Sequence, residues 1–379
     1  MRLGQQFDPR NNALNAWRLV LATGVIFWHS YLNTGHDVTF EPVHQFLRDA
    51  WVDGFFAISG FLIASSWFHN PRLREYFVAR ALRILPGLWA CLIVTAFVIA
   101  PIGVAIQGGS VSKLLLSTAP IVYVLKNSAV AMVQTDIAGT PLGIPWPHMW
   151  NGSLWTLLWE MFCYVAIAGL GVVGLLRRRW FIPLLLALAL FWSSQLPSLT
   201  SFGERPPGAE EIDVATVVLY AQATAARFAV MFAAGVLLFQ FRNEIPARWS
   251  LVAVSVAVVM ASTFMPNYRL IGAIPLAYAI IVSGALIRNR CLRLRTDLSY
   301  GMYIYAYPLQ TLLIMSGLLH PLGLSVVAAL VTLPVAALSW FFVEKPAMSL
   351  KSRFGRRSEP PEGGNQSAHN RGVELDPTK

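Results

Sequence analysis

The sequence predicts an all-α, polytopic membrane protein with about ten transmembrane helices, both termini in the cytoplasm and no soluble extracytoplasmic domain. The first observation behind this prediction is composition, because 56% of the 379 residues are hydrophobic and only 13% are charged. Soluble domains contain roughly 45–50% apolar and 25% charged residues. The second observation is that the apolar residues form long runs. Together these features exclude a soluble globular enzyme, a disordered protein and a fibrous repeat.

A spanning helix requires about 20 mostly apolar residues. Ten segments satisfy this requirement, namely 15–33, 51–68, 84–105, 153–175, 180–197, 214–239, 249–265, 269–287, 299–319 and 322–343. Residues 114–133 contain Pro120 and Lys126, and we interpret them as an interfacial or re-entrant piece, with a true span as the alternative. The membrane domain is therefore expected to occupy residues 1–350, and residues 351–379 have the composition of a disordered cytoplasmic tail.

The third observation is the position of the basic residues. With the N-terminus in the cytoplasm, most of the 29 Lys and Arg residues fall in inside segments. Those expected outside are Arg48, Lys113, Lys126, Arg205 and Arg269. The positive-inside rule then places both termini in the cytoplasm and favours an even number of spans. The net charge of +10 therefore comes mainly from basic residues that orient the protein in the membrane, and it does not indicate nucleic-acid binding.

An ionisable side chain inside a span costs about 2.5–3.5 kcal/mol, so each one is a candidate functional group. Arg18 and His29 are eleven residues apart, which puts them on one helix face, about 16 Å apart along the axis. Helical rise places His29 in the outer third of the membrane, and Glu160, about 12 Å from the outer boundary, at a similar level. Asp53 lies nearer the outer surface. We therefore predict a general base with carboxylate partners; the alternatives are a structural core histidine and a helix N-cap at Asp53.

Arginines gather at the opposite level. Arg80 and Arg83 are three residues apart and share one surface of the third span. Arg18 lies at a similar inner level, and Arg227 lies about 21 Å from the outer boundary of its span. Four cations at one level predict a site for phosphate groups on the cytoplasmic side. The alternatives are ordinary inside-positive charge and, for Arg18, a side chain that reaches to the membrane surface.

Trp155 and Tyr303 are weaker candidates, as substrate-binding residues. Tyr303 belongs to a stripe with Tyr300 and Tyr307 on one helix face, and such aromatic positions are also typical of packing or of an interfacial belt. The three cysteines are too few and too scattered for a disulfide framework or a zinc site, so we expect no metal.

On the basis of these residues, the chain resembles the acyltransferase-3 family of bacterial integral membrane O-acyltransferases. The resemblance extends from about Asn12 to Pro346. The family's elements occur in order. They are RLVLATGVIFWH with Arg18 and His29, VDGFFAISGFLI with Asp53, FVARALRILP with Arg80 and Arg83, SLWTLLWEMFCY with Trp155 and Glu160, RFAVMFAAG with Arg227, LSYGMYIYAYPLQ (298–310) and VEKPAM (343–348). No single element is specific, whereas the ordered set is.

The resemblance implies transfer of an acyl group, above all acetyl, from acyl-CoA on the cytoplasmic side to a carbohydrate hydroxyl at the outer half of the bacterial inner membrane. The acceptor would be an exopolysaccharide, an O-antigen or a lipid-linked oligosaccharide. His29 would deprotonate that hydroxyl or would itself be acylated first, and Asp53 and Glu160 would orient or charge-balance its ring. The CoA phosphates would be held by the four arginines, Arg18, Arg80, Arg83 and Arg227.

Two features depart from the family's pattern. Many relatives carry a histidine where this chain has Ala306, so more of the expected chemistry rests on His29. Some relatives carry a fused extracytoplasmic hydrolase-like domain. This chain is expected to act alone or with a separate extracytoplasmic transferase as its partner.

Two other classes of function compete with the enzyme. A secondary transporter or glycan flippase would use His29 and Glu160 as proton-relay groups, but it predicts inverted repeats, and the sequence shows no internal symmetry. A non-catalytic scaffold conflicts with the ionisable residues inside the spans, because each one is costly to insert.

Overall fold

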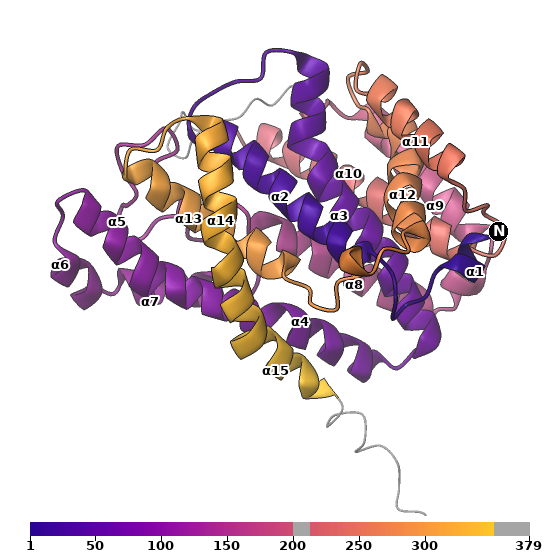
Figure 1. Ribbon diagram of the computed structural model, residues 1–379, viewed down its shortest axis with the longest axis horizontal. Coiled ribbons are helices and arrows are strands. Elements are labelled where there is room, and N and C mark those ends of the chain that lie inside the picture. The colour runs from indigo at the N-terminus through magenta and orange to yellow at the C-terminus, as the bar shows by residue number, and fades with distance from the viewer. Residues whose placement is uncertain (200–212, 352–379) are drawn as a thin grey trace, which may run out of the picture.

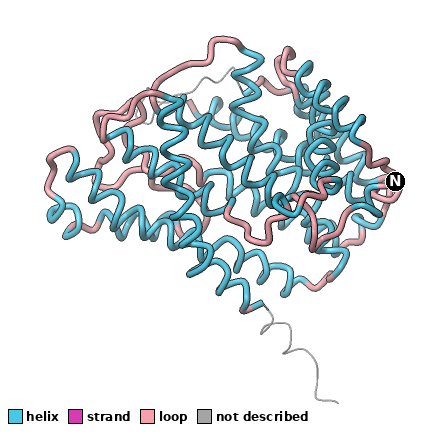
Figure 2. Tube along the Cα trace, in the orientation of Figure 1, coloured by secondary structure: helices cyan, strands magenta, loops and turns pink. Residues whose placement is uncertain are grey.

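The computed structural model describes residues 1–199 and 213–351, and within these ranges the regular elements are helices (Figure 2). Most of the outer loop predicted at 198–213, and the tail predicted at 351–379 apart from its first residue, lie outside the described residues. The helices before the first gap are α1 (Leu3–Gln6), α2 (Leu14–Asn33), α3 (Glu41–His69), α4 (Leu73–Val94), η1 (Thr95–Ile99), α5 (Ala100–Ile106), α6 (Val111–Leu116), α7 (Ala119–Asn127), α8 (Trp155–Val172), η2 (Leu175–Arg177) and α9 (Phe181–Gln195). The helices after it are α10 (Val214–Gln240), α11 (Trp249–Ser262), α12 (Arg269–Leu286), η4 (Arg290–Leu292), α13 (Ser299–Met315), α14 (Pro321–Ser339), η5 (Trp340–Glu344) and α15 (Lys345–Ser349).

Within residues 1–199 and 213–351, six helices are long and apolar enough to cross a membrane, which makes the chain a multi-pass membrane protein. They are Glu41–His69, Leu73–Ile106, Trp155–Val172, Val214–Gln240, Arg269–Leu286 and Pro321–Ser349. The other four predicted spans correspond to the helices α2, α9, α11 and α13. The helical nature of the predicted segments is therefore confirmed, while the total of ten spans and the cytoplasmic position of both termini stay predictions.

Helix α3 begins at Glu41, ten residues before the predicted start of its span. Half of the added residues are polar or charged, so hydropathy alone places the start of the span too late. Their polar groups find partners in the fold, because the Gln45 amide donates to the carbonyl oxygens of Met265 and Pro266 at 3.1 and 3.0 Å. Hydrogen bonds to residues distant in sequence thus stabilise a polar helical turn, which a search for apolar segments does not include.

Residues 114–133 do not form a single helix. Helices α6 and α7 are separated by a break at Ser117 and Thr118, and α7 contains only nine residues. Nine residues rise about 13 Å, less than half of the hydrocarbon core. Neither helix alone can span the membrane.

Helices α2 and α3 occupy the middle of the bundle, with α13 and α14 on one side and α11 and α12 on the other (Figure 1). Helix α3 packs along α10, and α2 packs along α13. Helices α4, η1 and α5 form one continuous helix, as do α14, η5 and α15, and both contain a π-helical segment where they are joined. Such segments often mark functional sites in long helices.

Two glycines allow α3 and α10 to cross closely. A Cβ atom on Gly60 would lie 2.1 Å from the carbonyl oxygen of Phe232, and one on Gly235 would lie 2.0 Å from that of Ala57. Both distances are far inside van der Waals contact and involve backbone atoms. Only glycine fits at these positions, as is usual where membrane helices approach closely.

We expect Gly235→Val to lower the free energy of unfolding by about 3 kcal/mol or more, because the new side chain must separate α3 from α10. Thermal melts of detergent-purified protein would measure this effect. Gly169→Ala is the matched control, since a Cβ atom there meets nothing within 4 Å. A Gly235→Val protein that melts like the wild type would contradict this account of the crossing.

Candidate functional site

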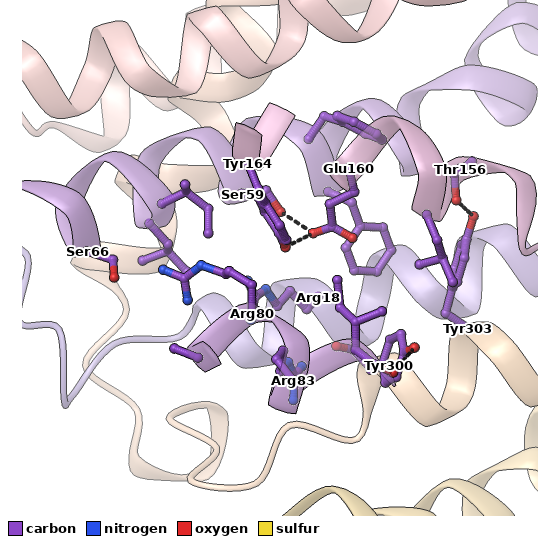
Figure 3. A pocket seen from close by; sticks show the side chains of 18 of the residues that line it. Arg18, Ser59, Ser66, Arg80, Arg83, Thr156, Glu160, Tyr164, Tyr300 and Tyr303 are labelled. Atoms are coloured by element: carbon purple, nitrogen blue, oxygen red, sulfur yellow. Dashed lines mark hydrogen bonds between the residues drawn. The ribbon is translucent and has the colours of Figure 1, made fainter. Parts of the chain in front are cut away.

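The bundle encloses a cavity of about 350 Å³ between α2, α3, α4, α8 and α13 (Figure 3). Its wall combines apolar side chains with charged and hydroxyl groups. The polar members include Arg18, Ser59, Ser66, Arg80, Arg83, Thr156, Glu160, Tyr164, Ser299, Tyr300 and Tyr303. The cavity is large enough for part of an organic ligand, and its polar groups come from five helices that are distant in sequence.

Arg18 and Arg83 meet at Asp297, in the loop before α13. The Asp297 Oδ2 atom accepts from the Arg18 Nη1 at 2.9 Å and from the Arg83 Nη2 at 2.5 Å. Ser299 donates to the other oxygen through its amide and its hydroxyl. Burial would by itself raise the pKa of the Asp297 carboxyl, but the Arg83 and Arg18 guanidinium groups outweigh this effect and lower that pKa to about 2. Asp297 therefore holds two cations in fixed positions at one end of the cavity.

Because its pKa is depressed in the folded protein, Asp297 contributes stability that is present above the unfolded pKa of about 4 and is lost as pH falls from there through about 2. We expect Asp297→Asn to lower the free energy of unfolding at pH 7 by on the order of 2 kcal/mol. Melting temperatures across a pH series would show the difference from wild type narrowing below pH ~4. The exposed helix-capping Asp213→Asn should match wild type throughout, and a pH-independent deficit in Asp297→Asn would refute the assignment.

Arg80 borders the same cavity without an ion-pair partner in the described part of the chain. Its guanidinium lies over the Tyr76 ring at 5.0 Å and the Tyr164 ring at 5.8 Å, and its buried Nε has no hydrogen-bond partner. Aromatic faces stabilise a cation without neutralising it. Arg80 therefore keeps donors available for an anionic ligand.

Arg83 is also linked to the π-helical segment η5. Its Nη1 lies 3.8 Å from the Glu344 Oε2, and its guanidinium lies over the rings of Tyr300 and Trp340 at 5.7 and 5.8 Å. Glu344 is only 1% exposed and accepts a hydrogen bond from Ser339 at 3.0 Å. The final membrane helix thus helps to fix the position of Arg83.

Glu160 lines the cavity with the arginines, whereas His29 does not line it. Its Oε1 accepts hydrogen bonds from the Ser59 hydroxyl at 3.1 Å and from the Tyr164 hydroxyl at 2.5 Å (Figure 3). The expected convergence of Glu160 on the His29 ring is therefore not what the structure shows. Equal depth on two helices does not bring side chains together when the helices turn different faces to each other.

His29 lies outside the 350 Å³ cavity, farther along the same face of α2 as Arg18. Its ring packs edge-on against Tyr307, with 5.1 Å between ring centroids, and its buried Nδ1 has no hydrogen-bond partner within the described ranges. Tyr307 follows Tyr303 by one turn of α13, and Tyr303 lines the cavity. The tyrosine stripe noted in the sequence thus leads from the arginine end of the cavity to His29.

Asp53 and Arg227 belong to a separate buried cluster that joins α3, α10 and α12. The Arg227 Nε donates to the Asp53 Oδ1 at 2.7 Å, and the Arg269 Nε donates to the Asp53 Oδ2 at 2.6 Å. The neighbouring Asp49 lies 3.2 Å from the Arg227 Nη1 and 2.7 Å from the Arg269 Nη2. Tyr268 donates to Asp53 at 2.5 Å. The two carboxylates are fully buried, and Arg48 pairs with Asp49 as well, at 3.1 Å.

This cluster corrects two expectations. Asp53 does not approach His29, because both of its oxygens are occupied by arginines and Tyr268. Arg227 does not join Arg18, Arg80 and Arg83, because it faces α3 in the middle of the bundle and pairs with carboxylates there. Depth along a helix was the basis for both expectations, and it carries no information about the direction in which a side chain points.

The two weaker candidates are separated as well. Tyr303 lines the cavity, and its hydroxyl lies 2.6 Å from that of Thr156 (Figure 3). Trp155 instead packs against Phe228, with 5.7 Å between ring centroids, and does not line the cavity.

Asp297 and Asp49 were not among the residues predicted from the sequence, Glu344 was noted there only as a residue at an inner helix end, and Arg269 was assigned to an outer segment. One feature of the sequence could have drawn attention to Asp297, because it is the acidic residue that follows the basic run Arg288, Arg290, Arg293 and Arg295. The other residues stand at the ends of the predicted spans, where charged side chains are common.

Fold and site together define a multi-pass helical membrane protein with cations fixed at one end of an internal cavity. The chain belongs to the acyltransferase-3 family, because the family model described as an acyltransferase domain matches residues 11–342. It is an O-acyltransferase, and the resemblance found in the sequence motifs is confirmed. Membership also favours the enzyme over the transporter and the scaffold.

Two relatives align over nearly the whole chain. "Nodulation protein 10" of Rhizobium leguminosarum bv. viciae is 28% identical over 361 residues, which cover 92% of this chain and 96% of the relative. "O-acetyl transferase" of Shigella phage Sf6 is 26% identical over 368 residues, which cover 93% of this chain and 98% of the relative. No solved structure matches the chain.

Proposed function

We propose that this O-acyltransferase transfers an acetyl group from cytoplasmic acyl-CoA to a hydroxyl of a cell-surface or exported carbohydrate, at the outer half of the bacterial inner membrane. The observation that carries the proposal is the placement of Arg18, Arg80 and Arg83 at one end of a cavity, with His29 about 16 Å farther along the face of α2 that bears Arg18. A phosphopantetheine arm, which joins the CoA diphosphate to the thioester, suits such a separation. The acetyl group is favoured because the phage relative is named an O-acetyl transferase.

In this proposal the arginines hold the phosphate groups of the donor. Guanidinium groups suit this task, because they remain charged and bind phosphate oxygens through paired donors. Asp297 keeps Arg18 and Arg83 aligned, and Arg80 offers donors that no carboxylate in the described residues occupies. A second hollow, of about 660 Å³, is formed by the segments that precede α2 and α13, and it is lined by Arg10, Asn11, Arg288, Arg290, Arg293 and Arg295. Its positive charge would attract the nucleotide part of the donor.

In the same proposal His29 is the general base. Its imidazole takes the proton from the acceptor hydroxyl as that oxygen attacks the thioester carbonyl carbon. The carbon–sulfur bond then breaks, and the imidazolium returns the proton to the CoA thiolate. The products are the carbohydrate O-acetyl ester and free CoA.

The carboxylates expected to orient His29 receive other roles. Glu160, held by Ser59 and Tyr164, shapes the donor cavity. Asp53 and Arg227 stabilise the α3–α10–α12 interface, and Arg227 is not assigned to the donor. A separate extracytoplasmic transferase is not required by the reaction as written.

The experiment that tests the function is mass analysis of surface glycans from the source strain, from a deletion of this gene and from the complemented deletion. We expect the deletion to lose a base-labile acyl ester and the complemented strain to regain it. Purified protein should also move radiolabel from [14C]acetyl-CoA to glycan prepared from the deletion strain. Unchanged glycan acylation in the deletion strain would overturn the proposal.

A further inference from the structure

Buried polar atoms without hydrogen-bond partners gather where α2 packs along α13. They are the Nδ1 of His29, the Nδ2 and Oδ1 of Asn33 and the Oε1 of Gln310. Asn33 follows His29 by four residues, so the two side chains are neighbours on one helix face. Gln310 donates to the Ile26 carbonyl oxygen at 2.8 Å and to the Ser30 hydroxyl at 2.7 Å, which fixes it beside the same stretch of α2.

Asn33 is the unusual member of this group. It is only 2% exposed, yet both polar atoms of its amide lack a hydrogen-bond partner among the residues that the structure describes. Burying an amide without hydrogen bonds costs free energy, and buried polar groups are therefore nearly always paired. This chain pairs Asn127 fully, because its amide donates to the carbonyls of Tyr123 and Gln134 and accepts from the backbone amides of Val133 and Gln134. An unpaired amide one helical turn from the proposed base indicates a ligand-binding site.

The chemistry of these atoms indicates what that ligand is. An amide offers both a donor and an acceptor, which matches a hydroxyl group, since a hydroxyl also donates and accepts. Gln310 adds one further acceptor. None of these residues carries a formal charge, so the site suits an uncharged polyol rather than a phosphate or a carboxylate. Asn33 is also the last residue of α2, about 6 Å beyond His29, on the side away from the donor arginines.

We propose that Asn33, with Gln310, binds hydroxyl groups of the carbohydrate acceptor and positions one of them beside the His29 ring. This inference rests on the proposed function, since it assigns the acceptor subsite of the same reaction. Asn33 contributes binding and orientation. The bond changes remain those of transfer from the thioester, with the acceptor proton passing to His29.

The test is Asn33→Leu, which keeps the size of the side chain and removes its polar atoms. The probes are [14C]acetyl-CoA and surface glycan prepared from a strain lacking this gene. We expect the KM for the glycan to rise about tenfold or more, while the KM for acetyl-CoA and the background hydrolysis of acetyl-CoA stay at the wild-type level. The Asn33→Ser variant retains a hydroxyl, so its KM for the glycan should lie between those of the wild type and of Asn33→Leu.

Thermal stability supplies the second measurement. Because Asn33 has no partner to lose, Asn33→Leu should melt at or above the wild-type temperature. Asn127→Leu is the matched control, which should melt lower and keep the wild-type KM for the glycan. An unchanged glycan KM in Asn33→Leu, or a melting temperature lowered as in Asn127→Leu, overturns the inference alone. Absence of transfer by the wild type overturns the proposed function and this inference together.

Discussion

Replacing His29 with alanine is expected to reduce glycan acylation by roughly 10²- to 10⁴-fold, the range typical of losing a general base. The physical reason is that an alcohol hydroxyl is a weak nucleophile until its proton has an acceptor in place. Helix α13 contains no histidine, so it supplies no second imidazole. The effect should appear in the turnover rate, with the KM for acetyl-CoA unchanged. Acylation of glycan in a strain lacking the native gene would measure it.

His44→Ala provides the matched control for this experiment. His44 lies on α3, packs edge-on against Trp28 with 5.1 Å between ring centroids, and borders no part of the donor cavity. We expect this variant to acylate glycan at the wild-type level. If His29→Ala, present at normal amounts in the membrane, also retained wild-type acylation, His29 could not be the base.

Replacing Arg227 with methionine is expected to lower the free energy of unfolding by about 3–5 kcal/mol. The reason is that Asp49 and Asp53 are fully buried, and removal of Arg227 takes away the donor to the Asp53 Oδ1 and one of the three arginines that surround Asp49. A loss of that size is a large part of the total stability of a typical domain, so we expect the variant to accumulate poorly. Fluorescence-detected size exclusion and thermal melts would show the loss.

Arg179→Met is the control for the removal of an arginine. Arg179 lies 2.7 Å from Glu244, but both side chains are exposed, and an exposed pair contributes at most about 1 kcal/mol. We expect that variant to behave like the wild type. Should Arg227→Met melt normally and show only a raised KM for acetyl-CoA, Arg227 would belong to the donor site after all.

The class of protein, the approximate positions of the helices and the family could all be predicted from the linear sequence. Each of the ten apolar segments contains a helix, and the ordered motifs identified the acyltransferase-3 family. Hydropathy and motif order are properties of the linear chain, and partition into a membrane depends on local composition alone. For the same reason the sequence also singled out the ionisable residues, since each one interrupts an apolar run.

Which of those residues contact one another depends on how the helices pack, and this could not be predicted from the sequence. Helical rise gives the depth of Asp53, Glu160 and Arg227, but depth does not specify a neighbour. Asp53 turns toward α10 and α12, so it pairs with Arg227 and Arg269, a residue that the sequence assigned to an outer loop. Asp297 joins Arg18 and Arg83 because the loop before α13 folds back to both helices, across more than two hundred residues of chain. Contacts of that length depend on helix rotation and packing, which no local pattern encodes.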